Sequence, residues 1–112
     1  MEQLQPCKFN LSIIKQLTIV LGEMSEALEA YAQYELQDDL TAMQMAKNHF
    51  LEELCDVQTA IETLKVHNFN KLEIERMHEY VNRKNYNRGY LDEKAIDSPY
   101  AGYIGFLLDK KD

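Results

Sequence analysis

The chain has 112 residues, of which 46% are hydrophobic, with only 4 Gly and 2 Pro, and this composition predicts one folded helical domain and excludes a largely disordered chain. Its net charge of −7 argues against nonspecific binding to nucleic acid, which needs a clustered basic surface. No apolar run approaches the roughly 20 residues that span a bilayer, so no membrane partner is expected.

The N-terminal residues and the cysteines predict a cytoplasmic protein. The start of the chain, MEQLQPCKF, lacks the basic residues and the long apolar region of a secretory signal. Cys7 and Cys55 have no CxxC spacing, so we expect reduced thiols and no zinc site.

The first predicted helix opens at Asn10, a residue type that is a good N-cap. Apolar residues then recur at alternating spacings of three and four, which is the pattern of a helix packed in a bundle: Ile14, Leu17, Leu21, Met24, Leu28 and Tyr31. Because further apolar residues widen this stripe, we expect more apolar surface than one short bundle covers, and therefore a homo-oligomer.

Two more helices are predicted downstream. Asp38 or Asp39 can cap a helix that begins near Leu40, and its core stripe is Met43, Phe50, Leu54, Val57, Ile61 and Leu64. Asn70 can cap a third helix from about Lys71 to Tyr86, which Gly89 ends because Gly tolerates the left-handed conformation. The aromatic residues of the tail, 91–112, are expected to dock on the bundle or on a neighbouring subunit.

Two pairs of acidic residues, Glu23 with Glu26 and Glu53 with Asp56, have the same offset of three positions. Residues three apart share one helix face, so two antiparallel helices can bring all four carboxylates around one pocket. Each pair lies in a strongly apolar helix, where repulsion among carboxylates is costly without a cation or protons. The pattern favours a site for a hard cation. Ordinary solvated acidic faces remain the alternative.

The segment from Asn82 to Arg88 adds basic and amide groups. Lys84 and Arg88 are four apart and can share a helix face, while Asn82 and Asn85 supply amide donors. Such side chains can hold phosphate oxygens. Stabilisation of the helix C-terminus through the macrodipole is the competing interpretation.

Taken together, Gly22-Glu23-x-x-Glu26, Glu52-Glu53-Leu54-x-Asp56 and Lys84-x-x-x-Arg88-Gly89-Tyr90 resemble the all-α nucleoside triphosphate pyrophosphohydrolases of the MazG-like superfamily. The resemblance implies one all-α domain over residues 1–112, an antiparallel helical bundle with its core over about residues 10–90. It also implies a homodimer or homotetramer, and Mg²⁺ as the cofactor with Mn²⁺ as a substitute. The implied metal ligands are Glu23, Glu26, Glu53 and Asp56, and the implied substrate-binding residues are Asn82, Lys84, Asn85 and Arg88.

The implied reaction is hydrolysis of a nucleoside triphosphate between the α and β phosphates, which gives a monophosphate and pyrophosphate. Many members of the superfamily carry an additional Glu where this chain has Gly22. Glu52 is therefore the candidate catalytic base, and a metal-ligating carboxylate is the alternative. The base and sugar preference stays open. The competing functional class is a noncatalytic helical module that binds a protein partner or a structural metal.

Overall fold

The computed structural model describes residues 2–91, and within that range the chain is all-α, as the sequence predicts. Its helices are α1 (Ile13–Glu35), α2 (Leu40–Asn68) and α3 (Lys71–Asn87). The chain divides into two units. The first extends to Asn70 and contains α1 and α2, and the second begins at Lys71 and contains α3. The predicted docking of the tail lies outside the described residues.

Side-chain caps and breaks in the pattern determine where the helices begin. The prediction of Asn10 as the first N-cap is wrong: Ser12 is the cap, with extended backbone and with Oγ accepting from Lys15 N. Ser caps as well as Asn does, and the helix begins two residues later than predicted. Asp39 is confirmed as the cap of α2, because its Oδ2 accepts from Ala42 N at 2.9 Å.

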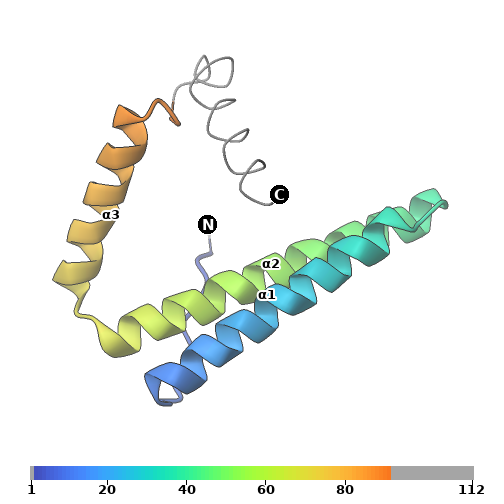
Figure 1. The fold of residues 1–112 in the computed structure, drawn as a ribbon. Helices are drawn as coiled ribbons and strands as arrows, with labels where there is room; N and C mark the ends of the chain where they lie inside the picture. Colours follow the sequence, from blue (N-terminus) through green and yellow to red (C-terminus); the bar gives the residue numbers. More distant parts are fainter. Residues whose placement is uncertain (1, 92–112) are drawn as a thin grey trace, which may run out of the picture. The chain divides into compact units, whose positions relative to one another are not determined.

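The helices α1 and α2 form an antiparallel hairpin, seen along its length in Figure 1. Contacts pair the beginning of α1 with the end of α2, since Asn68 Nδ2 donates to Gln16 Oε1. Near the turn, the rings of Tyr31 and Phe50 have centroids 5.3 Å apart. This register places the middle of α1, with its two glutamates, beside the middle of α2.

The interior of the hairpin is built from small and polar side chains rather than from the predicted apolar stripe. Ala27, Ala30, Gln16 and Thr63 are the buried residues of α1 and α2. Small side chains allow two helix backbones to approach closely. The seam between the helices therefore needs few large residues.

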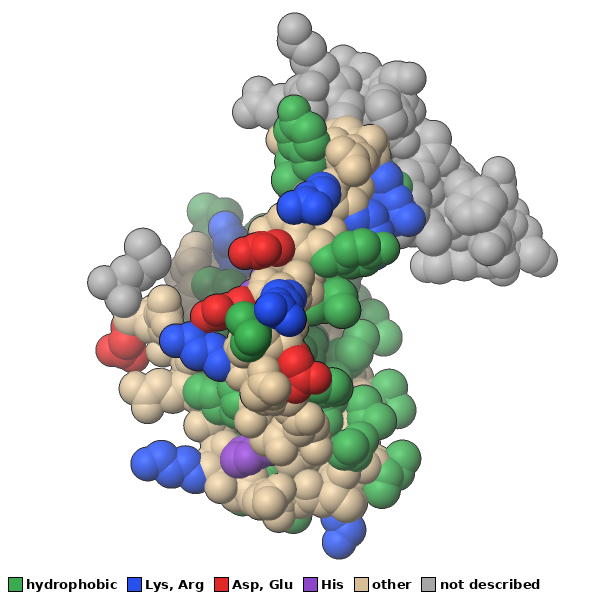
Figure 2. All heavy atoms as spheres, turned by 90° about the vertical axis from the view of Figure 1, so that its left-hand side faces the viewer, with side chains coloured by type: hydrophobic (Ala, Val, Ile, Leu, Met, Phe, Trp, Pro, Cys, Tyr) green, Lys and Arg blue, Asp and Glu red, His purple; other side chains and the backbone are tan. Residues whose placement is uncertain are grey.

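The apolar stripe of α1 (Ile14, Leu17, Leu21, Met24, Leu28 and Tyr31) is exposed in the described chain, contrary to the predicted packing in a core. Ile14 and Leu21 are each 69% exposed and Leu28 is 71% exposed. Together with Phe50, Leu54 and Val57 of α2, part of this stripe lines an open apolar groove of about 700 Å³. Exposed hydrophobic side chains are also visible among charged ones of both signs in Figure 2. None of the described helices is both long enough and apolar enough to cross a membrane.

In the second unit, α3 has the predicted bounds to within one residue and ends in a Schellman motif. Gly89 adopts a positive φ of 79°, Gly89 N donates to Tyr86 O, and Tyr90 N donates to Asn85 O. These are the two hydrogen bonds that define this C-terminal cap. Because an L side chain at such a φ is strained, the glycine explains why the helix stops where the sequence predicts.

Candidate functional site

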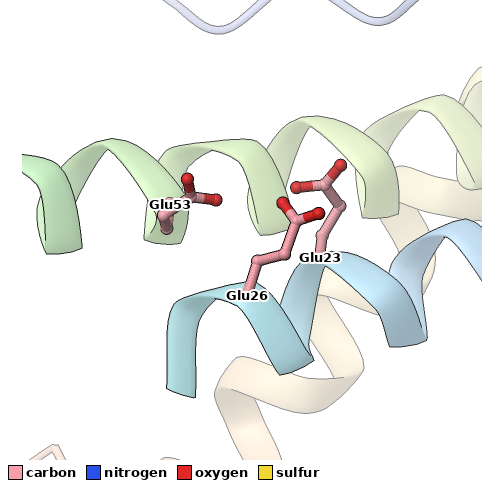
Figure 3. A group of neighbouring side chains, drawn as sticks. All are labelled: Glu23, Glu26 and Glu53. Atoms are coloured by element: carbon pink, nitrogen blue, oxygen red, sulfur yellow. The ribbon is translucent and has the colours of Figure 1, made fainter. Parts of the chain in front are cut away.

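Three carboxylates of the hairpin converge in the seam between its helices. Glu23 and Glu26 project from α1 and Glu53 from α2, and one oxygen of each lies within 4.8 Å of the others. Figure 3 shows the side chains from the two helices extending toward one another. We call these three residues the acidic cluster. Both residues of the first predicted pair and Glu53 of the second thus come together on facing helices, and the antiparallel register is the reason.

The electrostatics of the acidic cluster are unfavourable without a positive charge. Oε2 of Glu23 and Oε2 of Glu53 are both shielded from solvent and have no hydrogen-bond partner. Burial raises the pKa of Glu23 above its ordinary value of 4.5, and repulsion from Glu26, Asp56 and Glu53 raises it further. Burial also raises the pKa of Glu53, followed by repulsion from Glu26 and Asp56. The cluster therefore favours either protons or a cation.

The donor set of the acidic cluster fits a hard divalent cation. All its atoms are carboxylate oxygens, the ligand type that Mg²⁺, Mn²⁺ and Ca²⁺ prefer, whereas zinc sites draw on Cys and His. Two of those oxygens already lack partners, so coordination would satisfy them. This match concerns the ligands alone.

Asp56 and Glu52 occupy different positions from the three cluster residues. Asp56 is exposed, and it lines a cavity together with Glu23. Glu52 is 71% exposed and lies 3.5 Å from His49 Nδ1, while His49 Nε2 is 3.6 Å from Glu53 Oε1. Consecutive helix residues point about 100° apart, so Glu52 cannot share the direction of Glu53. His49, when protonated, offsets part of the negative charge on Glu53.

A cavity of about 300 Å³ lies next to the acidic cluster. It is on the side away from the turn, toward the start of α1 and the end of α2. Its walls from the two helices include Gln16, Ile19, Glu23, Asp56, Ala60 and Thr63. Two residues that precede α1, Cys7 and Phe9, complete the lining. This cavity was not predicted, because its walls come from three separate segments.

The N-terminal segment is fastened to α2 at Cys7. Its backbone N–H donates to Thr63 Oγ1 at 3.0 Å, and its carbonyl oxygen lies 2.7 Å from His67 Nε2. A carbonyl oxygen only accepts, so Nε2 is the protonated nitrogen of His67. Thr63 and His67 lie one helical turn apart. Both polar groups of the Cys7 backbone are thereby satisfied, and the segment is held against the cavity.

Gln16 is the one buried polar wall residue of the cavity on α1, with only 2% of its surface exposed. Its Oε1 accepts from Asn68 Nδ2, but its Nε2 has no hydrogen-bond partner. An unsatisfied buried amide costs about 1–3 kcal/mol. Ile13, Ile19 and Val20 lie at helical spacing from Gln16. A polar residue among apolar ones on one helix face is the sequence signal that could have identified it.

The predicted cationic pair of α3 is brought together by the helix. Lys84 and Arg88 line a shallow hollow of about 260 Å³, together with Tyr80, Arg83 and Asn87. Lys84 Nζ lies 6.0 Å from the centroid of the Tyr80 ring. Among the described residues this lining includes neither Asn82 nor Asn85. Arg83 and Asn87, which are four positions apart, line the hollow in place of those two residues.

Comparisons of the chain with protein-family models, with curated proteins and with solved structures found no match. The functional argument therefore depends on the residues themselves.

Proposed function

We propose that this chain is a magnesium-dependent nucleoside triphosphate pyrophosphohydrolase that cleaves between the α and β phosphates. The observation that carries the proposal is the acidic cluster, with three carboxylate oxygens within 4.8 Å and two buried oxygens that have no partner. The motif order that resembles the MazG-like superfamily supports the same function. Mn²⁺ is the proposed substitute for Mg²⁺.

In this proposal Glu23, Glu26 and Glu53 hold the cation, and Asp56 contributes from beside Glu23. A magnesium ion in such a site supplies positive charge that offsets a triphosphate and makes nearby water more acidic. The carboxylates fix its position and leave phosphate oxygens to complete the coordination. The pKa values of Glu23 and Glu53 are raised in part by repulsion from neighbouring carboxylates, and a bound cation would relieve that repulsion.

The second unit contributes cationic groups to the proposal. Lys84 and Arg88 share one hollow of α3, and we assign them to phosphate oxygens, for which the guanidinium fork of Arg is well suited. Asn82 and Asn85 remain candidate donors on the strength of the motif alone, and Arg83 joins them because it lines the hollow.

The catalytic base is either Glu52 or a carboxylate of the acidic cluster. Glu52 is exposed and lies beside His49, so a water molecule can reach its carboxylate. If Glu52 is the base, Glu52→Gln lowers kcat by about 10²–10⁴-fold and leaves cation binding unaltered. If a cluster carboxylate is the base, the same substitution has little effect on kcat.

We further propose that the exposed apolar stripe of α1 is covered by a second copy of the chain, which completes an antiparallel bundle as a homodimer or homotetramer. The groove lined by Leu21, Met24 and Leu28 gives a large apolar surface that a stable monomer rarely exposes. The same surface favours the competing function, a noncatalytic helical module that docks on another protein.

Pyrophosphate release from a panel of ribo- and deoxyribonucleoside triphosphates, with and without Mg²⁺, tests the proposed function. Magnesium-dependent release of pyrophosphate together with the matching monophosphate is the expected result. Release of inorganic phosphate alone would indicate a different bond. The absence of any turnover across the panel would leave the noncatalytic module as the better account.

A further inference from the structure

The cavity beside the acidic cluster has one polar group whose direction is fixed by chemistry. Asn68 Nδ2 donates both to Leu64 O and to Gln16 Oε1, each at 2.7 Å. A backbone carbonyl can only accept, so the atom of Asn68 that faces Leu64 O is its amide nitrogen. The Gln16 atom that accepts a hydrogen bond from the same nitrogen must then be the amide oxygen. The unpartnered end of Gln16 is therefore its NH₂ group, a donor.

Gln16 lines the cavity, and only 2% of its surface is exposed. Asn68, which holds the other end of the amide, does not line the cavity. The Nε2 atom is shielded from solvent. A small side-chain shift, of the kind that commonly accompanies binding, brings it to a ligand in the cavity.

The rest of the cavity suits a flat, uncharged ring. Ile19 and Ala60 give apolar walls, and Phe9 adds an aromatic side chain from the N-terminal segment. The volume of about 300 Å³ is at the lower end of the range for small-molecule pockets, which is enough for one heterocycle rather than a whole nucleotide. At one end the cavity reaches Glu23 and Asp56. A ring bound here would therefore have its phosphate-bearing side near the acidic cluster.

We propose that this cavity binds the base of the nucleotide and that Gln16 selects bases carrying a carbonyl group, by donating a hydrogen bond from Nε2 to the carbonyl oxygen; this inference rests on the proposed function. A free glutamine reads adenine with its donor and its acceptor together. Gln16 cannot do so, because its oxygen is committed to Asn68. A carbonyl oxygen that projects from the ring edge accepts from this donor, whereas adenine presents an amino donor at the same exocyclic position, so adenine nucleotides are the disfavoured class.

The variant Gln16→Leu removes the donor and keeps a side chain of similar size. The expected result is a rise in KM of about tenfold or more for uridine and inosine triphosphates, with kcat much less affected. The KM for adenosine triphosphate and the inhibition constant of inorganic tripolyphosphate, a base-free competitor, should change less than about twofold. An equal change for all four compounds, or none for any, would overturn the role of Gln16.

A second variant, Ala60→Leu, keeps Gln16 and fills the cavity, and both Ala and Leu favour helix. It should raise KM for uridine and inosine triphosphates without lowering the melting temperature. The role of the cavity can then be tested even if Gln16→Leu fails to fold. Unchanged KM values in a folded Ala60→Leu protein would show that the base binds elsewhere.

Binding of the free nucleosides separates this inference from the proposed function. Calorimetric titration with uridine and inosine needs neither phosphate nor turnover. If the chain hydrolyses no nucleotide but binds these nucleosides, and loses that binding in Gln16→Leu, the proposed function fails and the cavity assignment stands. If it hydrolyses nucleotides but the two variants leave nucleoside binding and KM unaltered, the reverse holds.

Discussion

The acidic cluster and the apolar stripe lie on two different faces of α1, and each face is unfavourable by itself. The cluster gathers carboxylates in the seam of the hairpin, where Oε2 of Glu23 and Oε2 of Glu53 have no partner. The stripe exposes large side chains such as Leu21 and Leu28, each about 70% exposed. In the account proposed above, α1 is stabilised from outside the hairpin in two ways, by a cation on one face and by a second copy of the chain on the other. Substitutions on one face should leave the other function intact.

The largest effect is expected from Glu53→Gln, which removes one charge from the cluster and keeps its shape. Magnesium-dependent turnover should fall by more than about 100-fold, because even residues that only support metal ligands cost 10–100-fold. The melting temperature without metal should not fall, since the change relieves repulsion. Glu29→Gln, at an exposed residue of the same helix, is the matched control. A large loss of stability in Glu53→Gln would point to a structural role instead.

A comparable substitution on the other face, Leu28→Glu, should separate the subunits. Leu28 is 71% exposed in the single chain, and burying a carboxylate in an apolar interface is costly. We expect the dissociation constant of the oligomer, measured by sedimentation, to rise by about 100-fold or more. Leu40→Glu is the control, because Leu40 is 81% exposed and lies at the start of α2. A wild-type protein that is monomeric at micromolar concentration would contradict the proposed assembly.

A smaller effect is expected from Arg88→Ala in the second unit. If Arg88 holds phosphate, kcat/KM should fall by about 10- to 150-fold, which corresponds to about 1.5–3 kcal/mol for a charge-assisted hydrogen bond. Arg88→Lys should recover only part of this if the contact is bidentate. Arg76→Ala, at an exposed arginine of α3, controls for lost charge. Unaltered kinetics with a slight loss of stability would assign Arg88 to the helix C-terminus alone.

The smallest effect is a dependence of stability on pH that a cation should remove. The folded-state pKa values of Glu23 and Glu53 lie above the ordinary value of 4.5, so the folded chain binds these protons more tightly than the unfolded chain. The free energy of unfolding should therefore fall as the pH rises from about 4.5 through the raised values. Melting curves without metal should show this trend, and Glu23→Gln should weaken it.

Magnesium at about pH 7 should restore the stability that is lost on deprotonation, because a ligand of the folded state stabilises it. His49, Glu26 and Asp56 also act on these carboxylates, so each variant changes a single position. A magnesium effect of equal size in Glu53→Gln would remove the acidic cluster from the explanation.

Local signals in the sequence predicted the helices, whereas the packing depended on contacts between distant residues. Asp39 and Gly89 mark helix ends through their own side chain or backbone, so composition and spacing were sufficient. The apolar stripe predicted an apolar face correctly but not what covers it. Periodicity gives the side of a helix that avoids water, and it contains no information about whether the cover comes from the same chain.

The candidate site was predictable to the same extent. The acidic pairs have a helical offset that places each pair on one helix face, and in this antiparallel hairpin three of the four residues meet. Gln16 was not predicted, because its partner Asn68 is 52 positions away and the Cys7–Thr63 bond spans 56. Contacts at such separations depend on the register of the hairpin and on the course of the N-terminal segment. Residue spacing within one helix reveals neither of these.

The most direct test of the central claim is titration with Mn²⁺ monitored by electron paramagnetic resonance, which measures cation binding without requiring turnover. The acidic cluster predicts saturable loss of the free-ion signal with the wild-type protein and with Glu29→Gln. It also predicts strongly weakened binding with Glu53→Gln, because one of three converging carboxylates has been neutralised. Binding of equal strength in Glu53→Gln and in the wild-type protein would contradict the account, as would the absence of saturable binding in both.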